Sequence, residues 1–121
     1  MELELGLHAT VTTTVGPQDT ARALGSGDVD VLGTPRVLAL AEEAAVAVVA
    51  PALPPDRTSV GTWVELDHSA PTRVGAQVSA TARLAAVDGR RLLFEITVEE
   101  GGTTVARVQH RRAIVDRATF S

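Results

Sequence analysis

The sequence predicts an α+β protein in which one long helix packs against an antiparallel sheet. Two patterns indicate this class. A helical repeat of apolar residues begins at Thr34 and stops before Pro51, and four strand-like runs follow it in the second half of the chain. A fifth strand-like run precedes the helix. One helix on one face of an antiparallel sheet lets each element bury its apolar side against the other.

The first third of the chain predicts one strand and a loop region. Residues 3–15 alternate and are rich in Val and Thr, which favours a strand that Gly16-Pro17 ends. Residues 19–24 are expected to form a short helical turn, and residues 28–33 a loop.

The long helix has a clear start and one apolar face. Thr34 and Pro35 are expected to be its N-cap and first helical position. At about 100° per residue, seven apolar residues share one face. They are Val37, Leu38, Ala41, Ala44, Ala45, Val48 and Val49. Glu42 lies at the margin of this face, whereas Glu43 points to solvent, so Glu42 is the better candidate for a functional carboxylate.

The later strands are expected at residues 58–70, 76–87, 91–99 and 103–115, with Asp88-Gly89 as a hairpin turn. Two of them carry polar groups on an otherwise apolar face. In the first of the four strands, the residues expected to share this face are Val60, Val64, Leu66 and His68. In the last strand they are Ala106, Val108, His110, Arg112 and Ile114. Polar groups in such places need hydrogen-bond partners or serve a reaction.

Composition narrows the class of function. The 121 residues suit a single domain, and a net charge of −4 argues against a general nucleic-acid binder. The absence of cysteine excludes a thiol nucleophile, and three isolated histidines indicate no metal site. We find no signal peptide and no apolar run of membrane-spanning length, so the expected location is cytoplasmic, without a membrane partner.

Several short motifs together resemble a known family. They are Gly-Thr-Pro-Arg-Val-Leu-Ala-Leu-Ala-Glu-Glu-Ala at residues 33–44, Val60-Gly61-Thr62, His68-Ser69-Ala70-Pro71-Thr72 with Gly75, Val87-Asp88-Gly89-Arg90-Arg91-Leu92, and His110-Arg111-Arg112-Ala113. Their order and spacing resemble the fluoroacetyl-CoA thioesterase-like family over roughly residues 8–116. The resemblance implies a hot-dog fold, in which a curved five-stranded antiparallel sheet wraps one central helix. It also implies a homodimer with its active sites near the subunit interface.

The resemblance places the family's functional residues at five positions. Thr34, Glu42 and His68 fall on its catalytic residues, Gly61 on a glycine that faces the thioester, and Arg112 on a substrate-contacting arginine. The implied function is hydrolysis of a small or medium acyl-CoA thioester without a metal or a separate cofactor. His68, oriented by Glu42, would activate Thr34 or a water, and the Gly61 N–H would bind the oxyanion.

Each of these residues also has a purely structural interpretation. Thr34 suits a helix cap, Gly61 a strand bulge, and Arg112 a buried ion pair with Glu42 or another carboxylate. The alternative function is therefore a non-catalytic hot-dog dimer that binds acyl-CoA or another small ligand. A hydratase is disfavoured because the helix carries no histidine.

Two further expectations concern geometry and specificity. Eight helical residues span about 12 Å, too far for Thr34 as a helix cap to touch Glu42 directly. The fluoroacetyl-specific member of the family has aromatics just before its threonine, whereas residues 28–32 contain none. We therefore expect no preference for a fluoroacetyl group.

Overall fold

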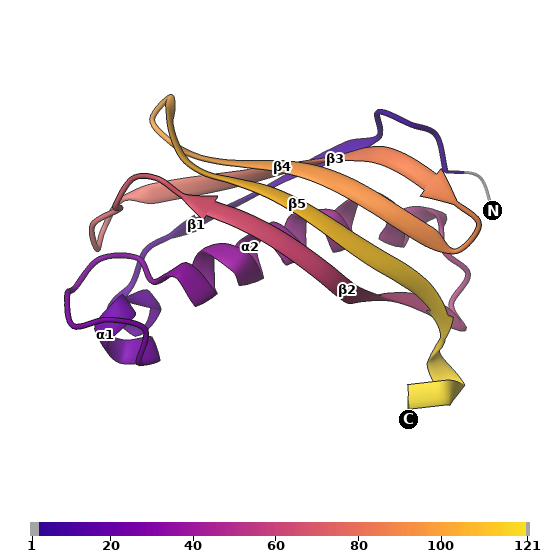
Figure 1. Cartoon of the computed structure of the whole chain (residues 1–121), viewed down its shortest axis with the longest axis horizontal. Coiled ribbons are helices and arrows are strands. Elements are labelled where there is room, and N and C mark those ends of the chain that lie inside the picture. The colour runs from indigo at the N-terminus through magenta and orange to yellow at the C-terminus, as the bar shows by residue number, and fades with distance from the viewer. Residues whose placement is uncertain (1–2, 121) are drawn as a thin grey trace.

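A computed structural model describes residues 3–120 and shows five strands and one long helix. The main elements are β1 (His8–Thr14), α2 (Thr34–Val49), β2 (Arg57–His68), β3 (Gln77–Asp88), β4 (Arg91–Glu100) and β5 (Thr103–Asp116). Short helical segments are η1 (Pro17–Asp19), α1 (Ala21–Leu24), η2 (Ala50–Ala52) and η3 (Arg117–Phe120). The strands pair antiparallel in the order β1-β3-β4-β5-β2, and the sheet curves over α2 (Figure 1). The predicted architecture is confirmed.

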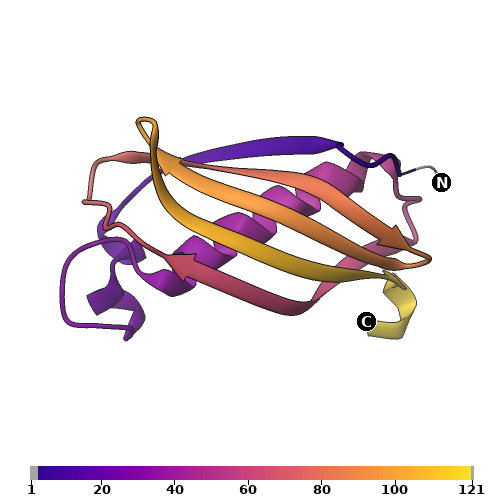
Figure 2. The same cartoon turned by 45° about the horizontal axis from the view of Figure 1, so that its top comes forward.

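The core lies between α2 and the concave face of the sheet (Figure 2). The buried residues of the helix are Val37, Leu40, Ala41, Ala44, Ala45, Val48 and Val49. The predicted apolar face is thus confirmed except at Leu38, which is half-buried while Leu40 takes its place in the core. Small alanines on this face let the helix approach the sheet closely.

Two predicted boundaries are wrong. β1 begins at His8 rather than at residue 3, because Gly6 adopts a φ of +90° and turns the chain before the strand. The long helix begins with Gly33 as its N-cap, so Thr34 is its first helical residue rather than its cap. This shift by one position leaves the Thr34 hydroxyl free of any capping role.

β2 is an edge strand with an irregular register. Its pairing with β5 shifts between Gly61 and Trp63, which marks a β-bulge. The extra residue reverses the alternation, so Ser59 rather than Val60 lies on the inner face with Val64 and His68. The expectation for Val60 is therefore wrong. The other edge of β2 has no partner strand within the described part of the chain.

Candidate active site

A hydrogen-bonded pair of a hydroxyl and an imidazole lies where α2 begins. Thr34 Oγ1 is 2.8 Å from His68 Nδ1, and the two residues come from the first turn of α2 and the last position of β2. Because Gly33 occupies the N-cap, no backbone N–H competes for the Thr34 hydroxyl. This is the distance at which an imidazole can take a proton from an attacking oxygen.

The start of α2 is held by a carboxylate that the sequence analysis did not single out. Asp19 accepts hydrogen bonds from the Gly16 backbone N–H at 2.8 Å and from Arg36 Nε at 3.2 Å. Its own backbone oxygen accepts the Gly33 N–H at 2.9 Å. These contacts tie η1 to the first turn of the helix and so fix the position of Thr34. Asp19 followed by a short helical turn gives no signal of this role in the sequence alone.

His68 has one ring nitrogen without a partner. Its Nε2 is buried and makes no hydrogen bond within the described residues. When Nδ1 accepts the Thr34 proton, Nε2 must carry the proton of the neutral ring. An N–H buried without an acceptor is costly, so a further acceptor is required at this position.

A second cluster forms around Arg112 in the middle of the concave face. Arg112 Nη1 donates to Glu42 Oε2 at 3.2 Å, which confirms the expected ion pair. Its Nε donates to Ser59 Oγ and its Nη2 to Ser59 O, both at 2.9 Å. The guanidinium is buried, whereas the Glu42 side chain is 39% exposed. The arginine thus holds a carboxylate that still reaches open space.

His110 completes this cluster as a neutral group. Its Nδ1 lies 2.8 Å from the carbonyl oxygen of Trp63, which can only accept, so Nδ1 carries the proton. Nε2 then accepts from Arg112 Nη1 at 3.0 Å. Burial lowers the pKa of His110, and the charge of Arg112 lowers it further, although the Trp63 carbonyl and Glu42 act in the opposite direction. Burial also lowers the pKa of Arg112, while Glu42 raises it.

Gly61 fits between these side chains only because it has no Cβ. A Cβ at this position would lie 2.8 Å from Glu42 Oε2 and 3.1 Å from His110 Cε1. The expected bulge at Gly61 is confirmed, and the backbone there closely approaches the side chains of Glu42 and His110. Gly61, Glu42 and His110 line a hollow of about 320 Å³ together with Leu38 and residues 62–64.

One chain therefore holds the predicted residues in two groups. Thr34 and His68 form one, and Glu42, Gly61 and Arg112 form the other. Glu42 does not contact His68 within the chain, because its carboxylate is engaged by Arg112 eight helical residues from Thr34. Sequence reasoning placed His110 on the inner face but missed its hydrogen bonds.

Other kinds of site find no support among the described residues. No group of three or more His, Cys, Asp or Glu side chains in residues 3–120 could hold a metal ion. No helix in that range is long and apolar enough to cross a membrane.

The curved sheet around one helix and the Thr-His pair at the helix start define a hot-dog-fold protein of the thioesterase type. The model of the FlK family, described as fluoroacetyl-CoA-specific thioesterase, matches residues 15–118. The chain therefore belongs to this family, and the resemblance seen in the sequence is confirmed.

Individual relatives agree with this assignment. The fluoroacetyl-CoA thioesterase of Streptantibioticus cattleyicolor is 34% identical over 92 residues, a match that covers 76% of this chain and 66%, slightly under two thirds, of that protein. A solved structure of FlK is 30% identical with a TM-score of 0.92, covering 99% of this chain and 93% of its own. A thioesterase superfamily member from Thermus thermophilus, at 24% identity and a TM-score of 0.91, covers 98% of this chain and 88% of its own and shares the fold.

Proposed function

We propose that this protein hydrolyses an acyl-CoA thioester, with a small or medium acyl group. The observation that carries the proposal is the 2.8 Å contact between Thr34 Oγ1 and His68 Nδ1. Membership of the FlK family supports it. A mutant of FlK has been solved in complex with fluoroacetate and CoA, and another in complex with acetyl-CoA.

His68 acts as the base in this mechanism. Nδ1 takes a proton from the Thr34 hydroxyl, or from a water held beside it, as that oxygen attacks the thioester carbon. The carbonyl oxygen gains negative charge, and the backbone N–H of Gly61 stabilises it. When the C–S bond breaks, His68 returns the proton to the departing CoA thiolate. An acyl group left on Thr34 is removed by water in the same two steps.

The two groups of residues meet only if two chains combine. The unpaired edge of β2 is twelve residues long and presents free backbone groups for pairing with a second copy. A two-fold axis at Glu65 places Leu66 opposite the partner subunit's Val64 on the inner face, where both apolar side chains become covered. The same register places His68 opposite the partner subunit's Thr62, one residue from the partner subunit's Gly61.

Pairing of two β2 strands would also supply a hydrogen-bond acceptor for the buried Nε2 of His68. Glu42 is partly exposed, lies beside Gly61, and uses only Oε2 in its contacts with Arg112 and His110. Across the β2 interface, it becomes the acceptor for the buried Nε2–H of the partner subunit's His68. The carboxylate then orients the base, as the sequence suggested, but from the other chain. We therefore propose a homodimer with two shared sites and no cofactor beyond the CoA of the substrate.

Mixing two inactive variants tests this function and the shared site together. Thr34→Ala and Glu42→Gln should each abolish release of free CoA thiol from an acyl-CoA. After equal mixing and exchange of subunits, half of the dimers contain one intact site, so about a quarter of wild-type activity should return. Failure to regain activity in proven mixed dimers would contradict the shared site. A wild-type protein that binds acyl-CoA without hydrolysing any of a panel would instead indicate a non-catalytic binding dimer.

Two expectations from the sequence stay predictions. They are a single hot-dog domain over residues 1–121 and a cytoplasmic location.

A further inference from the structure

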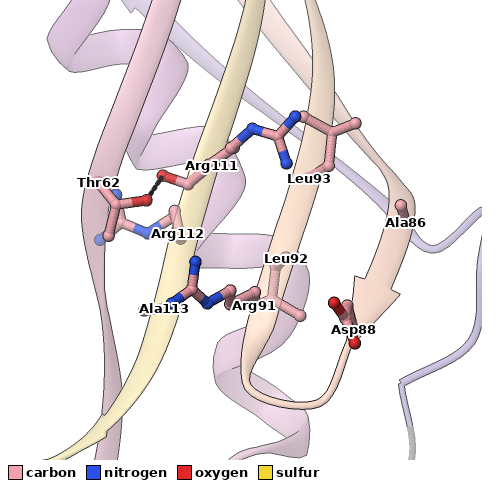
Figure 3. Close-up of a pocket in the computed structure, with 9 residues that line it drawn as sticks. All are labelled: Thr62, Ala86, Asp88, Arg91, Leu92, Leu93, Arg111, Arg112 and Ala113. Carbon is pink, nitrogen blue, oxygen red and sulfur yellow. Dashed lines mark hydrogen bonds between the residues drawn. The ribbon is translucent and has the colours of Figure 1, made fainter.

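The outer face of the sheet carries a cavity on the side away from α2. Its volume is about 490 Å³, and Figure 3 shows its lining residues from β2 to β5. Arg91 of β4 and Arg111 of β5 line it with exposed side chains, and Asp88 and the buried Arg112 also line it. Leu93 and Ala113 lie in register with the two exposed arginines, Leu93 opposite Arg111 and Ala113 opposite Arg91. The two guanidinium groups therefore stand over a small apolar floor as diagonal neighbours on one face.

These two arginines lack the carboxylate partners that most other arginines have. Six of the eleven arginines form ion pairs with Asp or Glu, but neither Arg91 nor Arg111 does so within residues 3–120. Asp88 also lines the cavity and is the register partner of Arg91. Figure 3 shows Arg91 reaching toward β5, whereas Asp88 lies on the other side of β4. Both side chains are exposed, so their guanidinium groups are available to an anion that enters the cavity.

An aromatic ring lies beside the charged groups. The guanidinium carbon of Arg111 is 5.3 Å from the centroid of the Trp63 ring, within the range of a cation–π contact. Trp63 is 41% exposed, so part of its surface remains open. Guanidinium groups bind phosphates through two parallel hydrogen bonds, and both indole and guanidinium planes stack on nucleobases. This combination suits a nucleotide better than a simple anion.

The cavity also lies close to the candidate active site. Thr62 lines both this cavity and the hollow that contains Gly61 and Glu42. Arg91 is paired through β5 with β2, and neighbouring strands are about 4.8 Å apart, so it lies roughly 10 Å from the bulge. A ligand anchored on the outer face could therefore have its other end at the edge of β2.

We propose that this cavity binds the phosphate groups and the base of a nucleotide. The inference rests on the proposed function in one respect, because the nucleotide half of the acyl-CoA substrate is one source of this chemistry. A free nucleotide is the other source. Arg91 and Arg111 hold the phosphates, Trp63 provides a stacking surface, and Asp88 accepts from an amino or hydroxyl group at the far side of the cavity.

The test compares a full substrate with one that lacks the nucleotide. In Arg91→Gln/Arg111→Gln, the KM for an acyl-CoA should rise by about tenfold or more, because charge-assisted hydrogen bonds to phosphate are lost. The KM for the same acyl group on pantetheine, which has no nucleotide, should stay unchanged, as should kcat for both. The matched control is Arg107→Gln, which removes an exposed arginine from the same face of β5 outside this cavity.

Calorimetry with 3′,5′-ADP tests the cavity independently of any hydrolysis, so it remains informative if the protein is not a thioesterase. Wild-type protein and the Arg107→Gln control should bind this nucleotide, and the double variant should not. Binding that is lost while the KM for acyl-CoA is unchanged would identify a free nucleotide as the source. Absence of nucleotide binding to the wild-type protein together with an unchanged KM would overturn the proposal. An equal rise in KM for both substrates would also overturn it.

Discussion

The three histidines of this chain occupy three different environments. His8 is exposed on β1, His68 is half-buried against Thr34, and His110 is buried beside Arg112. Only His68 combines contact with a hydroxyl and access to a hollow, which residues 69–71 and Val31 line with it. The environment of each ring, rather than its presence in the sequence, separates the candidate base from the other two.

Replacing His68 with Ala should lower kcat for thioester hydrolysis by about 10²–10⁴-fold, the usual contribution of a positioned general base. The fold should persist, because His68 is half-buried at the last position of an edge strand. Measurement of free thiol release and a circular dichroism spectrum check both statements. His8→Ala is the matched control and should behave as wild type. Near wild-type turnover in His68→Ala would remove His68 from the mechanism.

The buried His110 should make folding stability depend on pH. Its pKa in the folded protein is lowered, mainly by burial, so the unfolded chain binds more protons once the pH falls below about 6.5. The free energy of unfolding should therefore decrease as the pH falls from 7.5 to 5.5. Urea denaturation at several pH values measures this change.

A substitution isolates the part that His110 contributes to this pH dependence. His110→Asn keeps an N–H donor for the Trp63 carbonyl but cannot titrate, so the decrease below pH 6.5 should become smaller. His8→Asn removes an exposed histidine and should leave the decrease intact. An equal pH dependence in wild type and His110→Asn would contradict the assignment of a neutral, buried His110.

At the level of single residues, the sequence predicted some partners and missed others for a physical reason. An ion pair of Arg112 with Glu42 or another carboxylate could be predicted, because a charge on an apolar strand face needs a counter-charge. Ser59 and Asp19 could not, since their roles depend on backbone geometry that periodicity does not encode. Asp19 supports Thr34 because η1 packs against the start of α2, a contact that the sequence does not reveal.

At the level of elements, β2 shows where alternation of residues fails to predict which face of the sheet a side chain occupies. The order of strands and helix was predictable from apolar periodicity and turn residues, and Asp88-Gly89 indeed joins β3 to β4. A bulge inserts one residue and inverts the faces beyond it, so Val60 was placed on the wrong side. Gly61 was a hint of this irregularity. The sequence does not show why glycine is needed there, which is that a Cβ would lie 2.8 Å from Glu42 Oε2.

The loop before α2 adjoins His68, so its side chains bear on the acyl specificity of the proposed site. Leu32 of this loop is buried and donates its backbone N–H to Thr72 O, while Val31 lies beside His68 in the adjoining hollow. The three aromatic residues of the chain lie elsewhere. Trp63 is on the outer face, Phe94 is in the core, and Phe120 is in η3 at the end of the described chain.

Fluoroacetyl-CoA should therefore not be strongly preferred over acetyl-CoA. A fluorine differs from a hydrogen by less than a methylene, and an apolar pocket gains only about 1–3 kcal/mol from a methylene. Comparing kcat/KM for the two thioesters, after correction for their intrinsic hydrolysis rates, measures the preference. A corrected ratio above roughly a thousandfold, or about 4 kcal/mol, would show that recognition arises without aromatics in this loop.

At the level of the whole molecule, the core is extensive but built from small side chains. Phe94 is its only aromatic within the described residues, and the remainder is Ala, Val, Leu and Ile. Val64 remains 38% exposed on β2 because nothing covers the free edge of the sheet in one chain. Pairing of two β2 edges would bury Val64 and the free backbone groups of this edge. It would also complete both proposed active sites at once. Stability and activity are thus expected to depend on the same interface.

The melting temperature should consequently rise with protein concentration. When folding is coupled to association, each tenfold increase in concentration adds about 1.4 kcal/mol in favour of the dimer, which shifts Tm by about 3 °C for a dimer of this size. Scanning calorimetry across a hundredfold concentration range measures the shift, and sedimentation at the same concentrations gives the species present. Specific activity should fall together with the dimer fraction on dilution, because each proposed site combines Glu42 of one chain with His68 of the other. A monomer that keeps full activity and a constant Tm would contradict the β2 interface and would require both groups of residues to act within one chain.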